Sequence, residues 1–378
     1  MSTPLTRDQL YHSCDPDSFS FSTTAELAVL EQPIGQQNAL DAVDFAANIK
    51  QNGYNLYAMG PSGSGKHSAI MSFLQKKSAQ EPMPADWCYV NNFKDPHKPI
   101  AIPFPSGQAR KFKDDIYELI ELLKVVLPSV FESDAYLNQR EMINQRYLDQ
   151  QTDIFKGLPG ESAKPDVSKN VSAPSQVTFA SGIDGKGLSA GEVKHIEGKQ
   201  KEEITRKLAE VGGIVKEGLR KVSMLSKAQQ KEFKVLERKI TKDAVESIID
   251  EVRRKYADVE KISDYLDALQ NDVIRHVRDF LSKPDDMAAL PPFMQEFYAP
   301  SFTRYKVNLL ISNEVEDGAP VIFEDNPLHQ NLIGKIEHIA QVGTLVTDFS
   351  MIKPGALHRA NGGYLVLDAR KLLMQPFA

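Results

Sequence analysis

One stretch of the sequence combines residue types and spacing that suit phosphate binding. A glycine is followed after four residues by a Gly-Lys pair, within the run Gly60, Pro61, Ser62, Gly63, Ser64, Gly65, Lys66, His67 and Ser68. Glycines let successive backbone N–H groups turn toward phosphate oxygens, and the N-terminus of a following helix adds partial positive charge. The spacing predicts a P-loop that binds ATP or ADP, with Lys66 reaching the β- and γ-phosphates.

The residue after this lysine departs from the usual P-loop pattern. That position normally carries Ser or Thr, whose hydroxyl ligates Mg²⁺, and here it is His67. Imidazole is a poor ligand for this oxygen-preferring ion, and Ser68 could supply the hydroxyl only if the start of the helix shifted. We therefore expect phosphate binding to survive better than metal-assisted hydrolysis, with Mg²⁺ bound weakly.

A second candidate site element lies near the end of the sequence. Two glycines precede the apolar run Tyr364–Leu367, and Asp368 follows it directly. An Asp at the carboxyl end of such a strand holds Mg²⁺ in P-loop ATPases, so the sequence predicts this role for Asp368, through water. Capping of the strand end is the alternative. Ala369 stands where hydrolytic ATPases usually carry Glu, which is a second reason to expect slow hydrolysis.

An α/β core would position these residues. Helical spacing covers Asn38–Asn48 and Ser68–Lys77, and short apolar runs predict strands at Tyr54–Met59 and Trp87–Val90. Further strand-like runs lie at 305–311, 321–323, 343–347 and 363–367. Strand, Gly-rich turn, helix and strand in this order begin a parallel sheet. The predicted fold class is therefore α/β, with the parallel sheet of a P-loop NTPase interrupted by a mostly helical insertion.

The middle of the chain has a different composition. Residues 136–155 predict an amphipathic helix, and 157–191 gather Gly, Ser, Pro and Lys, with a possible hairpin turn at Gly182–Gly185. Residues 198–283 are helical in pattern, but the heptad is not sustained, which favours a small helical domain over a strict coiled coil. We predict an N-terminal segment 1–30, core halves 31–130 and 301–378, and an insertion 131–300 with the flexible segment 157–191.

The composition is that of an ordinary soluble protein. The 378 residues are 41% hydrophobic and 25% charged, which excludes a wholly disordered chain. No run approaches the ~18 apolar residues of a membrane span, and the start lacks the basic and apolar regions of a signal peptide. Cys14 and Cys88 form no disulfide framework or metal pattern, and a net charge of −6 gives no overall nucleic-acid signature. We expect a cytoplasmic protein without a membrane partner.

These motifs resemble a known family. Ile34-Gly35-Gln36 ahead of a helix, the run Gly53–Lys66 and the run Pro354–Asp368 closely resemble the ATPase module of Lon-related proteases. Tyr89–Phe93, with Pro96 and Pro99, is similar to the strand after the P-loop in Lon-related ATP-dependent proteases. The resemblance implies an AAA+-type core in which Ile34 and Gly35 lie near the adenine base. A helix-entry turn is the alternative for these two residues.

The resemblance also implies a serine endopeptidase that acts on protein substrates and assembles as a ring. In such proteins a Ser–Lys dyad lies in a domain that follows the ATPase module, so we expect the dyad, the sensor residues and the arginine finger beyond Ala378 and no catalytic residue in this stretch. The run Gly187–Gly191 fits Gly-x-Ser-x-Gly. A nucleophile elbow needs a buried strand before the serine and a helix after it, and this run closes the Gly/Ser-rich segment instead. We interpret it as a chance match.

Two other functions remain open. A nucleotide-responsive interaction scaffold that binds ATP without consuming it is favoured by His67 and Ala369. A nucleic-acid-binding ATPase depends only on a basic stretch of the insertion, for which a solvated helix face and a surface for an acidic partner are the alternatives. That stretch contains Lys216, Arg220, Lys221, Lys227, Lys231, Lys234, Arg238 and Lys239.

Overall fold

The computed structural model describes most of the chain. The described residues are 4–6, 10–11, 13–27, 36–49, 51, 53–61, 63–156, 181–183, 186–188, 199–282, 301–313, 318–341 and 343–375. Three of the predicted site residues, Ile34, Gly35 and Ser62, lie outside this part of the chain. So does Ser189 of the Gly-x-Ser-x-Gly match.

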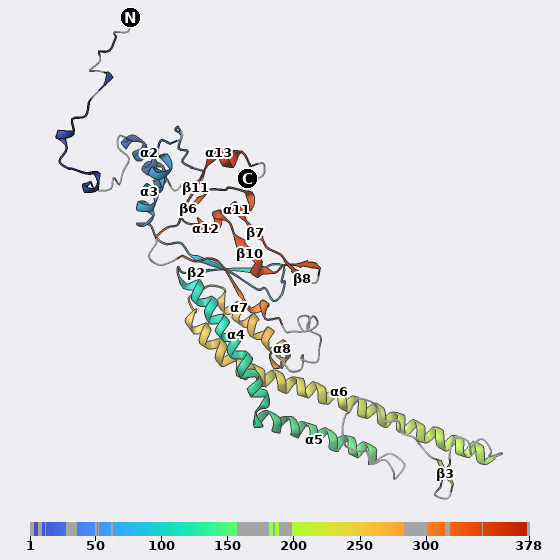
Figure 1. Ribbon diagram of the computed structural model, residues 1–378. Helices are drawn as coiled ribbons and strands as arrows, with labels where there is room; N and C mark the ends of the chain where they lie inside the picture. The colour runs from blue at the N-terminus through green and yellow to red at the C-terminus, as the bar shows by residue number, and fades with distance from the viewer. Residues whose placement is uncertain are drawn as a thin grey trace. The chain divides into compact units, whose positions relative to one another are not determined.

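The chain divides into two compact units (Figure 1). The α/β unit comprises residues 1–88, 103–110 and 309–378, and the helical unit comprises 89–102 and 111–308. Residues 89–102, 111–130 and 301–308, which the sequence assigned to the two core halves, fall in the helical unit. The predicted limits describe functional domains and stay predictions.

The α/β unit contains short helices and short strands. Its helices are η1 (Pro16–Ser18), η2 (Thr24–Glu26), α2 (Gln37–Asn48), α3 (Lys66–Ser78), α11 (His329–Ile333), η5 (Phe349–Met351), α12 (Ala356–Arg359) and α13 (Ala369–Leu373). Its strands are β6 (Val321–Glu324), β7 (Gly334–Ile336), β8 (Ile339–Gln341), β9 (Thr344–Val346), β10 (Ile352–Pro354) and β11 (Tyr364–Leu367). The sequence-based predictions of α2, α3, β6, β9 and β11 are confirmed.

The strands do not form the single parallel sheet that the sequence predicted. Among the described residues, β11 pairs with β6 in parallel, whereas β10 pairs with β7 and β8 with β9 in antiparallel fashion. A three-stranded sheet has the order β2-β1-β5, formed by β1 (Asp86–Val90), β2 (Ile100–Phe104) and β5 (Val307–Ile311). The α/β class is therefore confirmed, and the parallel pairing is found at β6 and β11.

Helix α3 is held against β6 at both of its ends. At its last residue, the Ser78 carbonyl accepts a hydrogen bond of 2.9 Å from the backbone N–H of Ala319, just before β6. Near its first residue, the His67 ring lies 4.4 Å from the Phe323 ring, centroid to centroid. The helix therefore runs antiparallel to β6, and its N-terminus lies at the carboxyl end of that strand.

The segment Tyr54–Met59 is not a strand, so that prediction was wrong. Tyr57 is 67% exposed and Met59 is 85% exposed, and no strand among the described residues pairs with this segment. A strand needs a neighbour for its backbone N–H and C=O groups and a packed surface for its side chains. The apolar composition of this segment provides neither a neighbouring strand nor a packed surface.

Asp86 joins three separate segments of the α/β unit. Its side chain is fully buried, and its Oδ1 accepts a hydrogen bond of 2.8 Å from the backbone N–H of Asn313. Its Oδ2 accepts one of 3.2 Å from the backbone N–H of Ala109. Burial, with a smaller contribution from the Asp86 charge, raises the pKa of the Cys88 thiol to about 12, so this thiol stays protonated.

The helical unit is dominated by one long helix. It contains the C-terminal part of α4 (Gln108–Glu132), with α5 (Asp134–Lys156), the 57-residue α6 (Lys199–Lys255), α7 (Ile262–Arg275), α8 (Val277–Leu281) and η4 (Thr303–Tyr305). A hairpin is present in this segment, formed by β3 (Ser181–Ile183) and β4 (Lys186–Leu188), which pair antiparallel, but Gly182 and Ile183, which were predicted in the turn, lie in β3. Two of its predicted turn residues, Asp184 and Gly185, lie outside the described residues.

Helix α5 packs along α6 (Figure 1). Among the buried and half-buried positions of α6, one series recurs in steps of three and four residues: Val215, Gly218, Val222, Leu225, Gln229, Glu232 and Leu236. This spacing is that of a coiled-coil seam, which the sequence analysis had judged less favourable than a small helical domain. Polar contacts cross it, since Gln229 donates to Asn144 at 3.1 Å and Arg146 pairs with Glu232.

Aromatic and charged contacts join α4 to the C-terminal end of α6 within the helical unit. The Phe112 ring of α4 packs edge-on against Tyr256, with centroids 5.1 Å apart. The Asp115 carboxylate accepts hydrogen bonds from Tyr256 at 2.6 Å and from Lys255 at 3.0 Å. Burial and the bond to Asp115 raise the pKa of the Tyr256 hydroxyl, so this donor stays protonated.

Glycine substitutions provide a test of the packing around β11. A Cβ added at Gly363 would lie 2.1 Å from the Pro320 carbonyl oxygen, whereas one at Gly213, in α6, would meet no atom within 4 Å. We expect Gly363→Ala to lower the free energy of unfolding by about 1–3 kcal/mol. Gly213→Ala should raise it by about 0.5–1 kcal/mol, because Ala loses less entropy than Gly in a helix.

Urea unfolding checks both changes. Trp87, the single tryptophan, lies in the α/β unit, so its fluorescence follows Gly363→Ala, and circular dichroism at 222 nm follows Gly213→Ala. Unchanged stability of Gly363→Ala would show that the approach to Pro320 is not as close as described.

Candidate functional site

The loop Gly60–Ser68 requires glycine at two of its positions. Gly63 has φ 80° and Gly65 has φ 73°, both in the left-handed region that side chains disfavour. At Gly60 an added Cβ would meet only Ser64 Oγ at 3.4 Å and Lys66 Cδ at 3.9 Å, which are ordinary contacts. The backbone turns at Gly63 and Gly65 therefore create the loop, and Gly60 only begins it.

The side chains of the loop bind its own carbonyl groups. Lys66 Nζ donates hydrogen bonds to the carbonyl oxygens of Gly60 and Pro61, both at 3.1 Å, and Ser64 Oγ donates to Pro61 at 2.9 Å. Every described residue from Gly60 to Ser68 is exposed. The ammonium group of Lys66 is thus directed back over the loop and can exchange these carbonyls for phosphate oxygens.

The loop lies at the edge of the parallel strand pair where α/β proteins bind ligands. Because α3 is antiparallel to β6, its N-terminus lies at the carboxyl end of β6, and β11 is parallel to β6 with Leu367 opposite Glu324. Ligands of open α/β sheets bind outside the carboxyl ends of the strands. The 13-residue α3 also directs its partial positive charge toward this edge.

His67 packs on the strand. Its ring is tilted by 60° to the Phe323 ring at 4.4 Å between centroids. It offers no oxygen to a metal ion. In the part of the chain that the structure describes, no group of three or more His, Cys, Asp or Glu side chains is arranged to hold a metal. Because the residue after Lys66 supplies no hydroxyl, the donor set of the loop does not fit the usual Mg²⁺ site of a P-loop ATPase.

Asp368 is the N-cap of α13. Its Oδ1 accepts hydrogen bonds from the backbone N–H groups of Arg370 at 2.9 Å and Lys371 at 3.2 Å. The sequence left open capping of the strand end as the alternative, whereas the structure shows a cap on the helix that follows the strand, which engages one carboxylate oxygen. The predicted metal role of Asp368 stays a prediction.

Other charged residues at this edge are paired. Glu324, the last residue of β6, accepts a bond of 3.1 Å from Arg359. Asp325 binds Lys371, and this hydrogen bond raises the pKa of the lysine. Sequence reasoning missed Phe323 and Glu324 as site residues, because their contacts with His67 and Arg359 join segments that are distant in the sequence and leave no local pattern.

The fold is of the α/β class, and two segments of the chain match domain families. Residues 317–378 match the LonB-like AAA domain family, and residues 86–119 match the Lon-like LonC helical domain family. Both matches support a Lon-related family for this chain, in agreement with the resemblance in its motifs. The first match includes β6, β11 and Asp368, and neither includes the loop Gly60–Ser68.

Two further findings concern the sequence and its helices. No curated protein matches this sequence. No helix in the described residues is both long enough and apolar enough to cross a membrane.

A double-mutant cycle measures the contact between His67 and Phe323. Tilted aromatic pairs are worth about 0.5–1.5 kcal/mol beyond burial, and His67 is exposed, so we expect a coupling of about 0.5–1 kcal/mol from His67→Ala, Phe323→Ala and the double variant. Urea unfolding followed by Trp87 fluorescence gives the three values. Additive effects would mean that the two rings do not contact in solution.

Proposed function

We propose that this chain is the nucleotide-binding, substrate-handling part of a Lon-related ATP-dependent serine endopeptidase. One observation carries the proposal: the P-loop begins an α-helix at the carboxyl edge of the β6–β11 pair. Its strand pair lies inside the segment that matches the LonB-like AAA domain, which supports nucleotide binding. An AAA+-type core with a helical insertion is the arrangement that this proposal requires.

The loop residues would bind ATP or ADP through the phosphates. Lys66 would exchange the carbonyls of Gly60 and Pro61 for β- and γ-phosphate oxygens, because charge-assisted bonds to phosphate are the stronger ones. The turns at Gly63 and Gly65 direct backbone N–H groups into the same space. As part of the proposal, Ile34 and Gly35 lie near the adenine base.

Nucleotide would be bound with little or no hydrolysis. His67 replaces the hydroxyl that normally ligates Mg²⁺ and is packed on Phe323. Ala369 begins α13, so no carboxylate directly follows Asp368. Asp368 already engages one oxygen in the helix cap. The same features favour the second candidate, a nucleotide-responsive interaction scaffold, which differs in lacking a partner protease.

The remaining parts of the proposal come from the Lon-related resemblance. They are protein substrates, assembly as a ring, a cytoplasmic location, and a Ser–Lys dyad in a domain beyond these residues. No residue of this chain is assigned to peptide hydrolysis. The long helices of the helical unit provide the surface for handling substrates.

Nucleotide affinity should depend on Lys66. We expect Lys66→Ala to weaken ADP binding by roughly ten- to hundredfold, because it removes a charge-assisted contact worth about 1.5–3 kcal/mol. Lys76→Ala is the matched control, since Lys76 is exposed on the last turn of the same helix. Isothermal titration calorimetry measures all three proteins. Equal affinity of wild type and Lys66→Ala would refute the site.

Magnesium should add little to nucleotide binding. We expect ADP affinity of the wild-type chain to agree within about threefold in Mg²⁺ and in EDTA, and ATP turnover to lie far below the ordinary rate of about 1 s⁻¹. His67→Thr should bind more tightly in Mg²⁺ only, because it restores the hydroxyl. A tenfold or larger effect of Mg²⁺ on the wild type would contradict this account and would indicate another ligand, such as Ser68.

A further inference from the structure

The exposed face of α6 carries a continuous row of basic side chains, here called the basic stripe. Its members recur in steps of three, four and seven residues: Lys216, Arg220, Lys227, Lys231, Lys234, Arg238 and Lys242. All seven side chains are exposed. At 100° per residue they lie on the face opposite the seam that contacts α5. The row spans about 39 Å at 1.5 Å per residue.

Basic side chains outnumber acidic ones along the stripe, and no ion pair joins a stripe residue to an acidic one within the described residues. Residues 216–242 contain nine basic and three acidic side chains, within a chain whose net charge is −6. Each of the three glutamates faces another partner: Glu217 pairs with Lys221 at 3.4 Å, Glu237 with Arg278 at 3.9 Å, and Glu232 with Arg146 of α5. No ion pair within the described ranges reaches a stripe residue.

This arrangement disfavours the isolated helix. Like charges four residues apart repel one another on a helix, and the stripe contains such pairs at 216/220, 227/231, 234/238 and 238/242. The same helix uses opposite charges elsewhere, as in the Glu217–Lys221 pair. An acidic partner would relieve the repulsion along the whole row.

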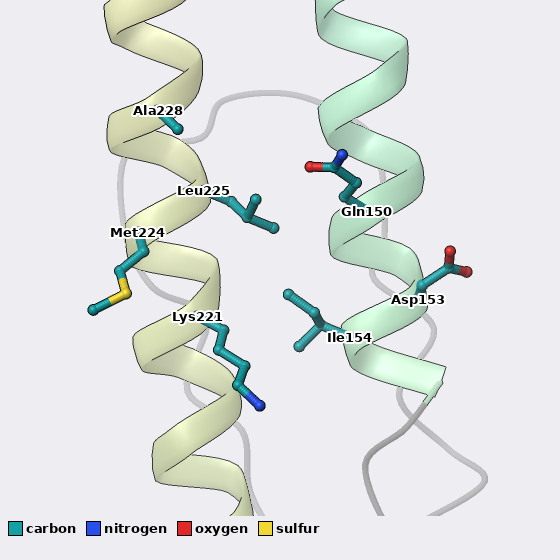
Figure 2. A pocket seen from close by; sticks show the side chains of 7 residues that line it. All are labelled: Gln150, Asp153, Ile154, Lys221, Met224, Leu225 and Ala228. Carbon is teal, nitrogen blue, oxygen red and sulfur yellow. The ribbon is translucent and has the colours of Figure 1, made fainter.

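An apolar ridge runs along one edge of the stripe. Met224 is 55% exposed, Val235 is 59% exposed, and Ala228 lies between them on the same face. The ridge continues into a groove of about 550 Å³ between α5 and α6. In Figure 2, Leu225 and Ile154 point toward one another across this groove, and Lys221 extends from α6 beside them. The groove's one carboxylate, Asp153, pairs with Lys156 at 3.4 Å.

We propose that the basic stripe and the apolar ridge bind an acidic amphipathic polypeptide segment that lies along α6. Charge complementarity selects acidic side chains, and the ridge selects apolar ones at helical spacing. A nucleic acid fits less well, because single-stranded binding sites stack bases on aromatic rings. The one aromatic residue of 216–242, Phe233, lies near Arg140 of α5, 5.7 Å from its guanidinium carbon. This surface is independent of the proposed nucleotide site.

Binding of a designed peptide to the full chain tests the proposal. The probe is a fluorescein-labelled peptide of about 27 residues, the length of the stripe, with glutamates four residues apart on one face and leucines on the adjoining edge. Its first control has glutamine for every glutamate. A single-stranded DNA oligonucleotide of about 27 nucleotides serves as the alternative ligand. Fluorescence anisotropy at several salt concentrations gives the affinities.

Two charge-matched variants separate the stripe from overall charge. Lys227→Glu/Lys231→Glu/Lys234→Glu reverses the centre of the stripe. Lys111→Glu/Lys113→Glu/Lys306→Glu makes the same change in net charge at exposed lysines of the helical unit outside α6. Circular dichroism confirms that both variants are folded. Met224→Ser/Val235→Ser tests the ridge.

We expect the stripe variant to bind the acidic peptide at least tenfold more weakly than wild type. The matched variant should bind it with an affinity within twofold of wild type. Affinity for the acidic peptide should fall as the salt concentration rises. The glutamine peptide should bind poorly, and the ridge variant should bind the acidic peptide a fewfold more weakly than wild type. Lys66→Ala should bind the peptide as wild type does, which separates this result from the nucleotide site.

Three results would overturn the proposal. The first is that the acidic peptide does not bind the wild-type chain. The second is that both charge variants weaken binding of the peptide equally. The third is that the oligonucleotide binds in a way that depends on the stripe while the peptide does not. The last result would assign the stripe to nucleic acid.

Discussion

The position of helix α3 against β6 is the constraint on which the candidate site depends. The hydrogen bond between Ala319 and Ser78 fixes one end of the helix, and the contact between His67 and Phe323 fixes the other. Together they place the loop Gly60–Ser68 at the carboxyl end of β6, where β11 runs alongside in parallel. Without this orientation, the same glycines and lysine would form only an exposed loop.

Much of the fold could be predicted from the sequence, because the relevant signals are local. Helical periodicity gave α2, α3 and α5, and apolar runs gave β1 and β11. The failure at Tyr54–Met59 shows the limit of such signals, since a strand also requires a partner that composition does not reveal. The contact between Phe323 and His67 could not be predicted for the same reason, because the sequence around neither residue indicates it.

His67 connects the packing of the site with its chemistry. Its ring gives α3 a contact with β6, and the position that it occupies is the one where P-loop ATPases place a metal-binding hydroxyl. A single residue would thus both pack α3 against β6 and remove the hydroxyl that binds Mg²⁺. The sequence located this departure, but the structure adds a physical reason for an aromatic side chain there. The helical unit, with its separate basic surface, would act without depending on hydrolysis.

Hydrogen–deuterium exchange of the chain, measured with and without saturating ADP, shows whether the loop Gly60–Ser68 binds nucleotide. It locates the bound nucleotide without assuming a site. The account predicts slower exchange in peptides that cover Gly60–Ser68 and the first turn of α3, with α6 unchanged. Unchanged exchange in this loop, or protection that appears only elsewhere in the chain, would contradict the claim that this loop binds nucleotide phosphates.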